Sequence, residues 1–411
     1  MSRFRRRLMG LAALRQAAAD DFVRVEYIEN TSTAYINSGI FGTMNLDFYV
    51  EFEPTQLHQN SGKGLGSIFG SRAEWNQNVY QLTTFNKNAT NKGHFIAAKN
   101  YGFSDNRVPT ANMFLGGKNI IKKEGLIFTR ADGTTFNLTS QSFTTPTRIS
   151  IFGLTNVNGG VGENCKFKLY KLQFSKNGTL VRDFIPMYQI SKDTYGLWDR
   201  VEEKFYTSPN GVKFTGGERV IADANENLYY LKNYINVSNN QRKDLGYQPV
   251  GNDSWEGKFY FIGTGRQDII GAWNSQGQKQ YGFMGIENRQ MRFLYNTQTV
   301  YNTLSYGNKT FTLKADKNKF YIYDANNKLL WNSSATYTSG NNPVRNFIVG
   351  HLNDSVYASN ARMYYFKYMR GDNLVWDLIP VQRCSDKVWG LFCKVHNSFY
   401  ESDGGTAFTG G

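Results

Sequence analysis

The sequence predicts an all-β protein in which two tandem β-sandwiches follow a short basic N-terminal segment. The 411 residues hold 40 Gly, 26 Tyr and 30 Phe but only 8 Pro, a composition typical of many short strands joined by tight turns. Apolar and polar residues alternate along many short stretches, which indicates strands with one buried face. The second half of the chain also repeats the first. An all-α protein and a wholly disordered chain are both excluded.

The charge of the chain is strongly positive but unevenly distributed. Subtracting 33 acidic from 47 basic side chains gives +14, which would normally suggest a nucleic acid or another anionic partner. About a third of the excess lies within residues 3–15, and the remaining Lys and Arg are scattered among turns. We therefore expect no nucleic acid partner.

The three cysteines, Cys165, Cys384 and Cys393, cannot all pair within one chain. None stands in a CxxC or Cys/His spacing that would indicate a zinc site. We expect free thiols in a protein that folds in a reducing compartment, with no bound metal and no cofactor.

The N-terminal segment, residues 1–21, reads as an amphipathic basic helix or extended anchor. Its apolar residues recur at helical spacing, and five arginines accompany them. The sharpest interpretation is a peptide that docks onto a larger assembly, steered by its cations and held by buried apolar side chains. The docking residues would be Arg3, Phe4, Arg5, Arg6, Arg7, Leu8 and Leu11.

Other interpretations of this segment stay open. A basic start followed by a short apolar run and small residues at 17–19 imitates a signal peptide. A solvated tail without a role and a DNA-binding peptide are further alternatives. No stretch approaches the ~20 apolar residues that a membrane-spanning helix needs, so we expect no membrane partner.

An internal duplication sets the domain organisation. Residues 180–217 align without a gap on residues 374–411 at an offset of 194, shown by Gly196-Leu197 and Gly390-Leu391. Both copies end in Phe-Thr-Gly-Gly. The sequence therefore predicts one module at 22–218 and a homologous one at 219–411.

Within each module, alternating segments such as 48–52, 168–174 and 319–323 predict antiparallel strands, and Asn177-Gly178 and Asp132-Gly133 predict turns. A module of this length needs two stacked sheets, because one open sheet would leave an apolar face in water. A jelly-roll sandwich satisfies this requirement.

The repeated end motif makes local predictions. We expect the strand that contains Asp183 to stop at Pro186, because proline lacks the N–H of the ladder. A hairpin should then bring Trp198 against Phe205 in the sandwich core. We interpret Asp183 as a structural acceptor rather than a catalytic acid.

Several segments of the sequence resemble a known protein family. EYIENTSTAYINSG from Glu26, ISIFGLTN from Ile149 and FKLYKLQFSKNGTLVRDFIP from Phe167 are followed by GLWD, KFYTS and FTGG. Together they resemble the concanavalin A-like (laminin-G-like) lectin modules common in bacteriophage virion and tail proteins. The opening MSRFRRRLMG is similar to the arginine-rich starts of crassvirus-like gut phage virion proteins, whose head fibres carry a short capsid-anchoring N-terminus. The resemblance implies two concanavalin A-like jelly-roll modules.

The sequence offers little for catalysis. No ExDxE run is present, and Glu51 and Glu53 share a strand face without a third acid. The four histidines are dispersed, and neither a GxSxG nucleophile elbow nor a GxxxxGK phosphate loop occurs. We therefore predict that the chain is not an enzyme.

Glycan binding remains a candidate function, since it needs only rings for stacking and polar groups for sugar hydroxyls. Similar loops follow Gly70 and Gly271. The candidate residues in them are Arg72, Trp75, Asn76, Trp273 and Asn274. The alternative is that both tryptophans pack beneath a loop.

Taken with the resemblance, the sequence predicts a phage virion structural protein, a head fibre or capsid decoration, assembled in the host bacterial cytoplasm. The expected partners are the phage capsid or another virion protein, further copies of the chain in a homo-oligomer, and a host-surface glycan. Alternatives are a tail fibre or adhesin of the phage, a secreted bacterial surface lectin, and a polysaccharide-degrading enzyme of the same fold.

Overall fold

The computed structural model describes most of the chain. The described residues are 21–55, 66–73, 77–83, 94–100, 107–109, 117–238, 241–249, 253–263, 270–273, 280–284, 291–296, 298–335, 348–350 and 360–411. Every regular element in these ranges is a β-strand. The predicted all-β class is confirmed.

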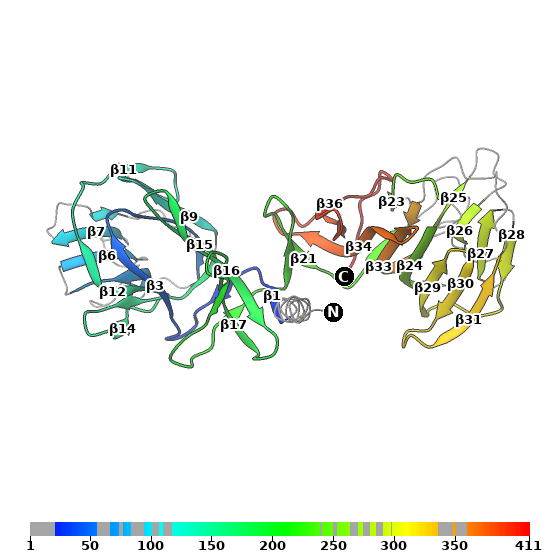
Figure 1. Ribbon diagram of the computed structural model, residues 1–411, viewed down its shortest axis with the longest axis horizontal. Helices are drawn as coiled ribbons and strands as arrows, with labels where there is room; N and C mark the ends of the chain where they lie inside the picture. Colours follow the sequence, from blue (N-terminus) through cyan, green and yellow to red (C-terminus); the bar gives the residue numbers. More distant parts are fainter. Residues whose placement is uncertain are drawn as a thin grey trace, which may run out of the picture. The chain divides into compact units, whose positions relative to one another are not determined.

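The chain forms two compact units, one that ends at Arg219 and one that runs from Val220 to Gly411. Each unit contains one larger and one smaller sheet, which Figure 1 shows as layers of strands within each unit. We call the units the first and second module.

The larger sheet of the first module has the order β11-β10-β9-β4-β15-β16-β17-β18. Strand β1 pairs with β16, and β2 lies between β15 and β19. The bounds are β1 Phe22–Arg24, β2 Ile28–Glu29, β4 Leu46–Pro54, β9 Asn119–Glu124, β10 Ile127–Thr129, β11 Thr135–Asn137, β15 Phe167–Lys176, β16 Thr179–Gln189, β17 Thr194–Asp199, β18 Lys204–Tyr206 and β19 Thr215–Gly216.

The smaller sheet of the first module has the order β14-β13-β5-β6-β7-β8, with β12 joining β3 to β5. The bounds are β3 Ile36–Thr43, β5 Ser67–Ser71, β6 Gln77–Thr83, β7 His94–Asn100, β8 Arg107–Pro109, β12 Thr144–Ile151, β13 Leu154–Thr155 and β14 Val161–Gly162.

The larger sheet of the second module has the order β20-β21-β34-β33-β24-β29-β30-β31. Strand β22 pairs with β33, while β35 lies between β34 and β36. The bounds are β20 Val220–Ala222, β21 Leu228–Leu231, β22 Ile235–Ser238, β24 Asp253–Phe261, β29 Thr310–Asp316, β30 Lys319–Tyr323, β31 Leu329–Ser334, β33 Asn360–Arg370, β34 Asn373–Arg383, β35 Trp389–Cys393 and β36 Ser398–Tyr400.

The smaller sheet of the second module has the order β23-β32-β25-β26-β27-β28. The bounds are β23 Arg242–Asp244, β25 Ile270–Trp273, β26 Gln280–Met284, β27 Arg292–Asn296, β28 Gln298–Tyr301 and β32 Ile348–Gly350.

Alternation along the strands builds each core. In β4, every second side chain from Leu46 to Phe52 is buried and the residues between them are partly exposed, as the period of two predicts. The buried side chains of each module form one large cluster. Aromatic rings dominate it: Phe95 and Phe128 stack with ring centroids 5.1 Å apart, and each fully buried Phe contributes about 2–3 kcal/mol to stability.

One cation lies inside the first core. The Lys123 side chain is fully buried, and its ammonium donates to the Met44 carbonyl at 2.8 Å and to Asp47 Oδ1 at 2.9 Å. Burial lowers the pKa of Lys123, an effect that the hydrogen bond and the charge of Asp47 oppose. Burial of the ammonium is tolerated because these hydrogen bonds replace those that it makes to water in the unfolded chain.

The strand that contains Asp183 does not stop at Pro186, so that prediction is wrong. Strand β16 continues to Gln189, and Pro186 pairs with Leu197 of β17. The Pro186 carbonyl accepts a hydrogen bond from the Val25 N–H. Since the N and O atoms of one strand residue point to the same side, the missing N–H also faces away from β17 and breaks no bond with it.

Trp198 and Phe205 lie opposite each other in the β17–β18 hairpin, as the sequence predicts. Their place in the core was predicted wrongly, because both are only partly buried and lie outside the main cluster. Both rings pack on Phe22, with centroids 5.1 and 5.0 Å away. The core side of the hairpin is instead Leu197, since adjacent strand residues point to opposite faces.

Candidate functional site

Most of the residues predicted from the sequence to form sites lie outside the described residues. These are the docking residues Arg3, Phe4, Arg5, Arg6, Arg7, Leu8 and Leu11, together with Trp75, Asn76 and Asn274. Trp273 ends strand β25, where its backbone pairs with Gln280 of β26, but its side chain is also outside the described part. Their assigned roles stay predictions.

Arg72 is the predicted glycan-binding residue whose side chain the structure describes. It follows β5, and its Nη1 atom lies 3.2 Å from Oε1 of Glu163. Gln81 Nε2 donates to Glu163 Oε2 at 2.7 Å and to Ser67 Oγ at 2.6 Å. We call Ser67, Arg72, Gln81 and Glu163 the Arg72–Glu163 cluster.

The cluster lies on the side of the smaller sheet that faces away from the core. Leu82 and Tyr80 of β6 belong to the core cluster, so Gln81 between them points outward. The Arg72 and Glu163 side chains are each 19% exposed. Guanidinium, carboxylate, amide and hydroxyl groups are all able to bind sugar hydroxyls, but here they bind one another first.

Sequence reasoning missed Glu163 and Gln81. Glu163 follows the short strand β14 and adopts a left-handed backbone, with φ of 51°, which non-glycine residues adopt rarely and often near functional sites. No local pattern marks it. Its proximity to Arg72 arises only because β5 and β14 each pair with β13.

A second candidate lies on the outer face of the larger sheet in the second module. Strand register places Tyr321 opposite Lys314, and Lys314 opposite Glu256. One step along the strands, Tyr323 lies opposite Thr312, and Thr312 opposite Lys258. Except for Thr312, which is buried, these positions are partly exposed and alternate with buried core residues, so they share the solvent side.

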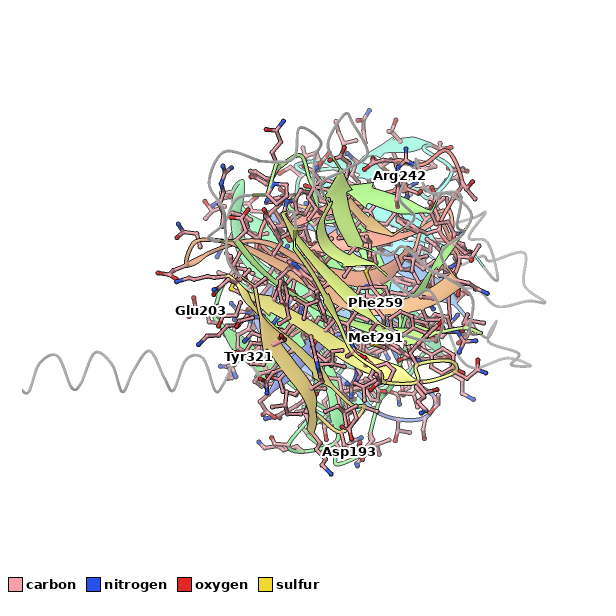
Figure 2. All side chains as sticks on the ribbon, turned by 90° about the vertical axis from the view of Figure 1, so that its right-hand side faces the viewer. Asp193, Glu203, Arg242, Phe259, Met291 and Tyr321 are labelled. Carbon is pink, nitrogen blue, oxygen red and sulfur yellow. The ribbon has the colours of Figure 1, made fainter. Side chains whose placement is uncertain are left out.

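The tyrosines of this surface are partly exposed. The Tyr321 and Tyr323 rings lie 6.2 Å apart at an interplanar angle of 20°. Tyr260 is also partly exposed on β24. Figure 2 labels Tyr321 on this face and Phe259, whose side chain is fully buried in the core beneath the same sheet. Partly exposed rings in a row provide an apolar platform for stacking.

Arg362 contributes a cation held between rings. Its guanidinium lies 4.6 Å from the Tyr234 ring centroid and 5.4 Å from that of Tyr260. Its buried Nε has no hydrogen-bond partner among the described residues. Since a guanidinium held over rings keeps its charge, Arg362 remains able to bind an anion.

Two lysines of this surface likewise have no counter-ion in the described part of the chain. Within the described ranges, neither Lys258 nor Lys314 forms an ion pair. The nearest carboxylate along the row, Glu256, accepts a hydrogen bond from Tyr365 at 2.7 Å through Oε1. Burial and this hydrogen bond raise the pKa of the Tyr365 hydroxyl. We call Lys258, Tyr260, Lys314, Tyr321, Tyr323 and Arg362 the tyrosine–cation face.

On the matching surface of the first module, two lysines are paired with glutamates. Lys118 lies 3.2 Å from Glu51, and Lys168 lies 3.3 Å from Glu53. The Tyr170 hydroxyl donates to Glu53 at 2.8 Å; burial, followed by this bond, raises the hydroxyl pKa. Glu51 and Glu53 do share one face, as predicted, but lysines neutralise them. Lys171 on the same face forms no ion pair with a described residue, and its ammonium lies 5.9 Å from the Tyr49 ring centroid.

The described part of the chain shows no group of three or more His, Cys, Asp or Glu side chains that could hold a metal ion. Cys165, Cys384 and Cys393 form no disulfide bond. Nor do the described residues include a helix that is long and apolar enough to span a bilayer.

Comparison with known proteins gives distant likeness in structure alone. No protein-family model matches the chain, and no curated protein matches it. Domains LG4–5 of the mouse laminin α1 chain share 9% identity at a TM-score of 0.27, covering 93% of this chain and 92% of that one. A mutant Trypanosoma rangeli sialidase with trans-sialidase activity shares 10% identity at a TM-score of 0.23, covering 71% of this chain and 64% of that one. The all-β sandwich assignment rests on the strands themselves.

Proposed function

We propose that this chain is a structural adhesion protein of a bacteriophage virion, a head fibre or capsid decoration, that displays two lectin-like sandwiches toward the host surface. Its N-terminal segment, residues 1–21, docks it to the capsid or to another virion protein. The modules bind a surface glycan without cleaving it. The virion assembles in the cytoplasm of the host bacterium.

The tyrosine–cation face is the observation that carries the binding role. It combines stacking rings with cations that form no ion pair with a described residue, on a partly exposed sheet surface. Sugars are recognised by the same combination, rings against their apolar faces and polar groups against their hydroxyls. A sheet surface of this kind can contact a polymer at any point along the polymer's length.

The sequence supports the placement on a virion. The arginine-rich first residues resemble phage head-fibre anchors, and five arginines with interspersed leucines suit docking onto an acidic groove. Two modules in one chain, multiplied in a homo-oligomer, would turn weak single contacts into avidity. A binding protein of this kind needs no cofactor.

Mass spectrometry of purified phage particles tests the placement. We expect the full-length chain in the particle with its first residues intact, and expect a chain that lacks residues 1–21 to be absent from particles. A chain cleaved near Ala19 and found in the medium would instead identify a secreted lectin. Incorporation that is unchanged without residues 1–21 would contradict docking.

A glycan array with the full-length chain tests the binding role. We expect retention on at least one envelope polysaccharide of the host and no release of reducing ends from it. Release of reducing ends would identify a polysaccharide-degrading enzyme instead. Absence of binding to every glycan and to host envelopes would remove the adhesion role.

A further inference from the structure

The charge of the tyrosine–cation face restricts the kind of glycan that it can bind. Three cations, Lys258, Lys314 and Arg362, occupy neighbouring strands of one sheet surface. Adjacent strands lie about 4.8 Å apart, so the three cations lie near one another on the same surface. A neutral sugar would leave them without a counter-ion in the complex, at a cost in desolvation.

The geometry points to an acidic polysaccharide, one that carries carboxylate or sulfate groups on its sugars, as the ligand of the tyrosine–cation face. This inference rests on the proposed adhesion role and assigns its site and ligand class. Tyr321 and Tyr323 would stack on sugar rings, while the cations pair with the anionic groups.

One carboxylate within the surface favours a glycan over DNA. Glu256 lies between Lys314 and Lys367 in the register of the sheet. Its Oε1 accepts the Tyr365 hydroxyl, and no described residue donates to its Oε2. Sugar hydroxyls are donors that this oxygen can accept. A DNA backbone offers phosphates and no hydroxyl donor, so Glu256 would repel it.

The two modules provide an internal control. Lys122 of β9 lies opposite Tyr49, at the position that Lys314 of β29 takes opposite Glu256. Lys122 and Lys168 pair with Glu124 and Glu53, so they are already neutralised. Removing these lysines changes the total charge equally but removes no unpaired cation.

The test measures binding of the full-length protein to matched polymers by affinity electrophoresis. Polygalacturonate and its methyl ester share one backbone but differ in carboxylate charge, and dextran sulfate and dextran differ in sulfate. We expect one or both acidic polymers to bind at least tenfold more tightly than their neutral partners. Which acidic polymer binds better identifies the anionic group.

Variants place the binding on the surface. Lys258→Gln with Lys314→Gln should weaken binding to the preferred acidic polymer about tenfold. Tyr321→Ala with Tyr323→Ala should weaken it by a similar factor, and Tyr321→Phe with Tyr323→Phe should restore it, because the rings remain. Lys122→Gln with Lys168→Gln should leave binding within about twofold of the wild-type value. Thermal unfolding of each variant shows that it is folded.

The remaining outcomes contradict the inference in distinguishable ways. Equal binding to acidic and neutral polymers, or unchanged binding by the Lys258/Lys314 variant, overturns it while the adhesion role stands. Tighter binding to oligo-dT than to either acidic polymer replaces the glycan by a nucleic acid. Binding to other array glycans alone also overturns it, whereas no binding to any glycan removes the adhesion role itself.

Discussion

The larger sheets of the two modules have equivalent strands at the repeated hairpin. At one cluster of side chains beside this hairpin, however, the two modules have residues of opposite chemical character. In the first module, Arg182 lies 3.4 Å from the buried Asp199 and 2.7 Å from Glu202. At the same offset of 194, the second module has Trp376, Cys393 and His396. An ionic network in one module corresponds to an aromatic cluster in the other.

Each arrangement gives part of its buried polar groups hydrogen-bond partners, although Asp199 Oδ2 has only the ion-pair contact with Arg182. Asp199 Oδ1 accepts the backbone N–H groups of Asp183 and Val201, each at 3.0 Å. Trp376 donates its ring N–H to the Leu245 carbonyl at 3.1 Å and lies 4.4 Å from the His396 ring centroid. The strand pairing is the same because backbone bonds, not these side chains, define it. The comparison shows that the backbone pairing of the hairpin is the same in both modules, although the side chains packed against it differ.

Removal of the buried acid should have the largest effect. Asp199→Ala leaves Arg182 without its buried partner and two N–H groups without their acceptor, so we expect a loss of about 3–5 kcal/mol in unfolding free energy. Cys393→Ala, the matched change in the second module, should cost about 1 kcal/mol. Calorimetry with hydrogen exchange over the hairpin measures both. Equal losses would show that the ionic network adds nothing.

The buried cation of the first module gives the next contrast. Lys123 lies opposite Phe48, whereas the second module places Ala315 opposite Trp255. Lys123→Met leaves the Met44 carbonyl and Asp47 without their donor, and should lower the unfolding free energy by about 3 kcal/mol. Chemical denaturation measures it. The side chain of its neighbour Lys122 is 38% exposed, so Lys122→Met should stay within about 0.5 kcal/mol of wild type. A comparable loss there would contradict a role for burial.

A shared glycine should respond equally in both modules. A Cβ at Gly196 would lie 2.3 Å from the Tyr206 carbonyl oxygen, and one at Gly390 would lie 2.6 Å from that of Tyr400. We expect each Gly→Ala change to cost about 2 kcal/mol, because the facing strand must shift. Gly162→Ala, with no atom within 4 Å, is the control. Thermal unfolding decides, and a cost in one module alone would show that the two hairpins pack differently.

The smallest effect should appear at alkaline pH in the first module. Burial and a hydrogen bond to Glu202 raise the pKa of Tyr206 to about 12. Between the usual tyrosine pKa of about 10 and this value, the folded chain holds the proton that the unfolded chain has lost, so stability falls as pH rises. Tyr206→Phe should cost about 1 kcal/mol at neutral pH and remove this part of the pH dependence. Stability of wild type and variant measured from pH 9 to 12 tests it; identical slopes would contradict the assignment.

Sequence patterns predicted the strands well, whereas most predicted site residues lie outside the described part of the chain, and their roles stay predictions. Alternation in β4, β15 and β30 depends on local burial alone, so the period of two is readable along the chain. Arg72 was selected for its place after a short strand, but its partner Glu163 is 91 residues away. The positions of Trp198 and Phe205 were misjudged because a hairpin has two faces, and pairing alone does not say which one is buried.

The tyrosine–cation face could not be predicted from the sequence, because its residues are far apart along the chain. Tyr260, Lys314 and Tyr321 come from three strands, and none stands in a motif. In both modules the sequence shows lysines and tyrosines along the same strands. Only strand register and side-chain contacts show that Glu51 and Glu53 pair with lysines in the first module. In the second, Lys258 and Lys314 form no ion pair with a described residue.

The sequence by itself determined the all-β class and the repeated hairpin, because side-chain alternation and turn residues act over a few neighbours. The tertiary structure alone decided which charges are paired, which rings face solvent and where a buried lysine finds its acceptors. Those properties depend on residues that are distant along the chain and meet only when strands pair in one particular register, so no local pattern could contain them.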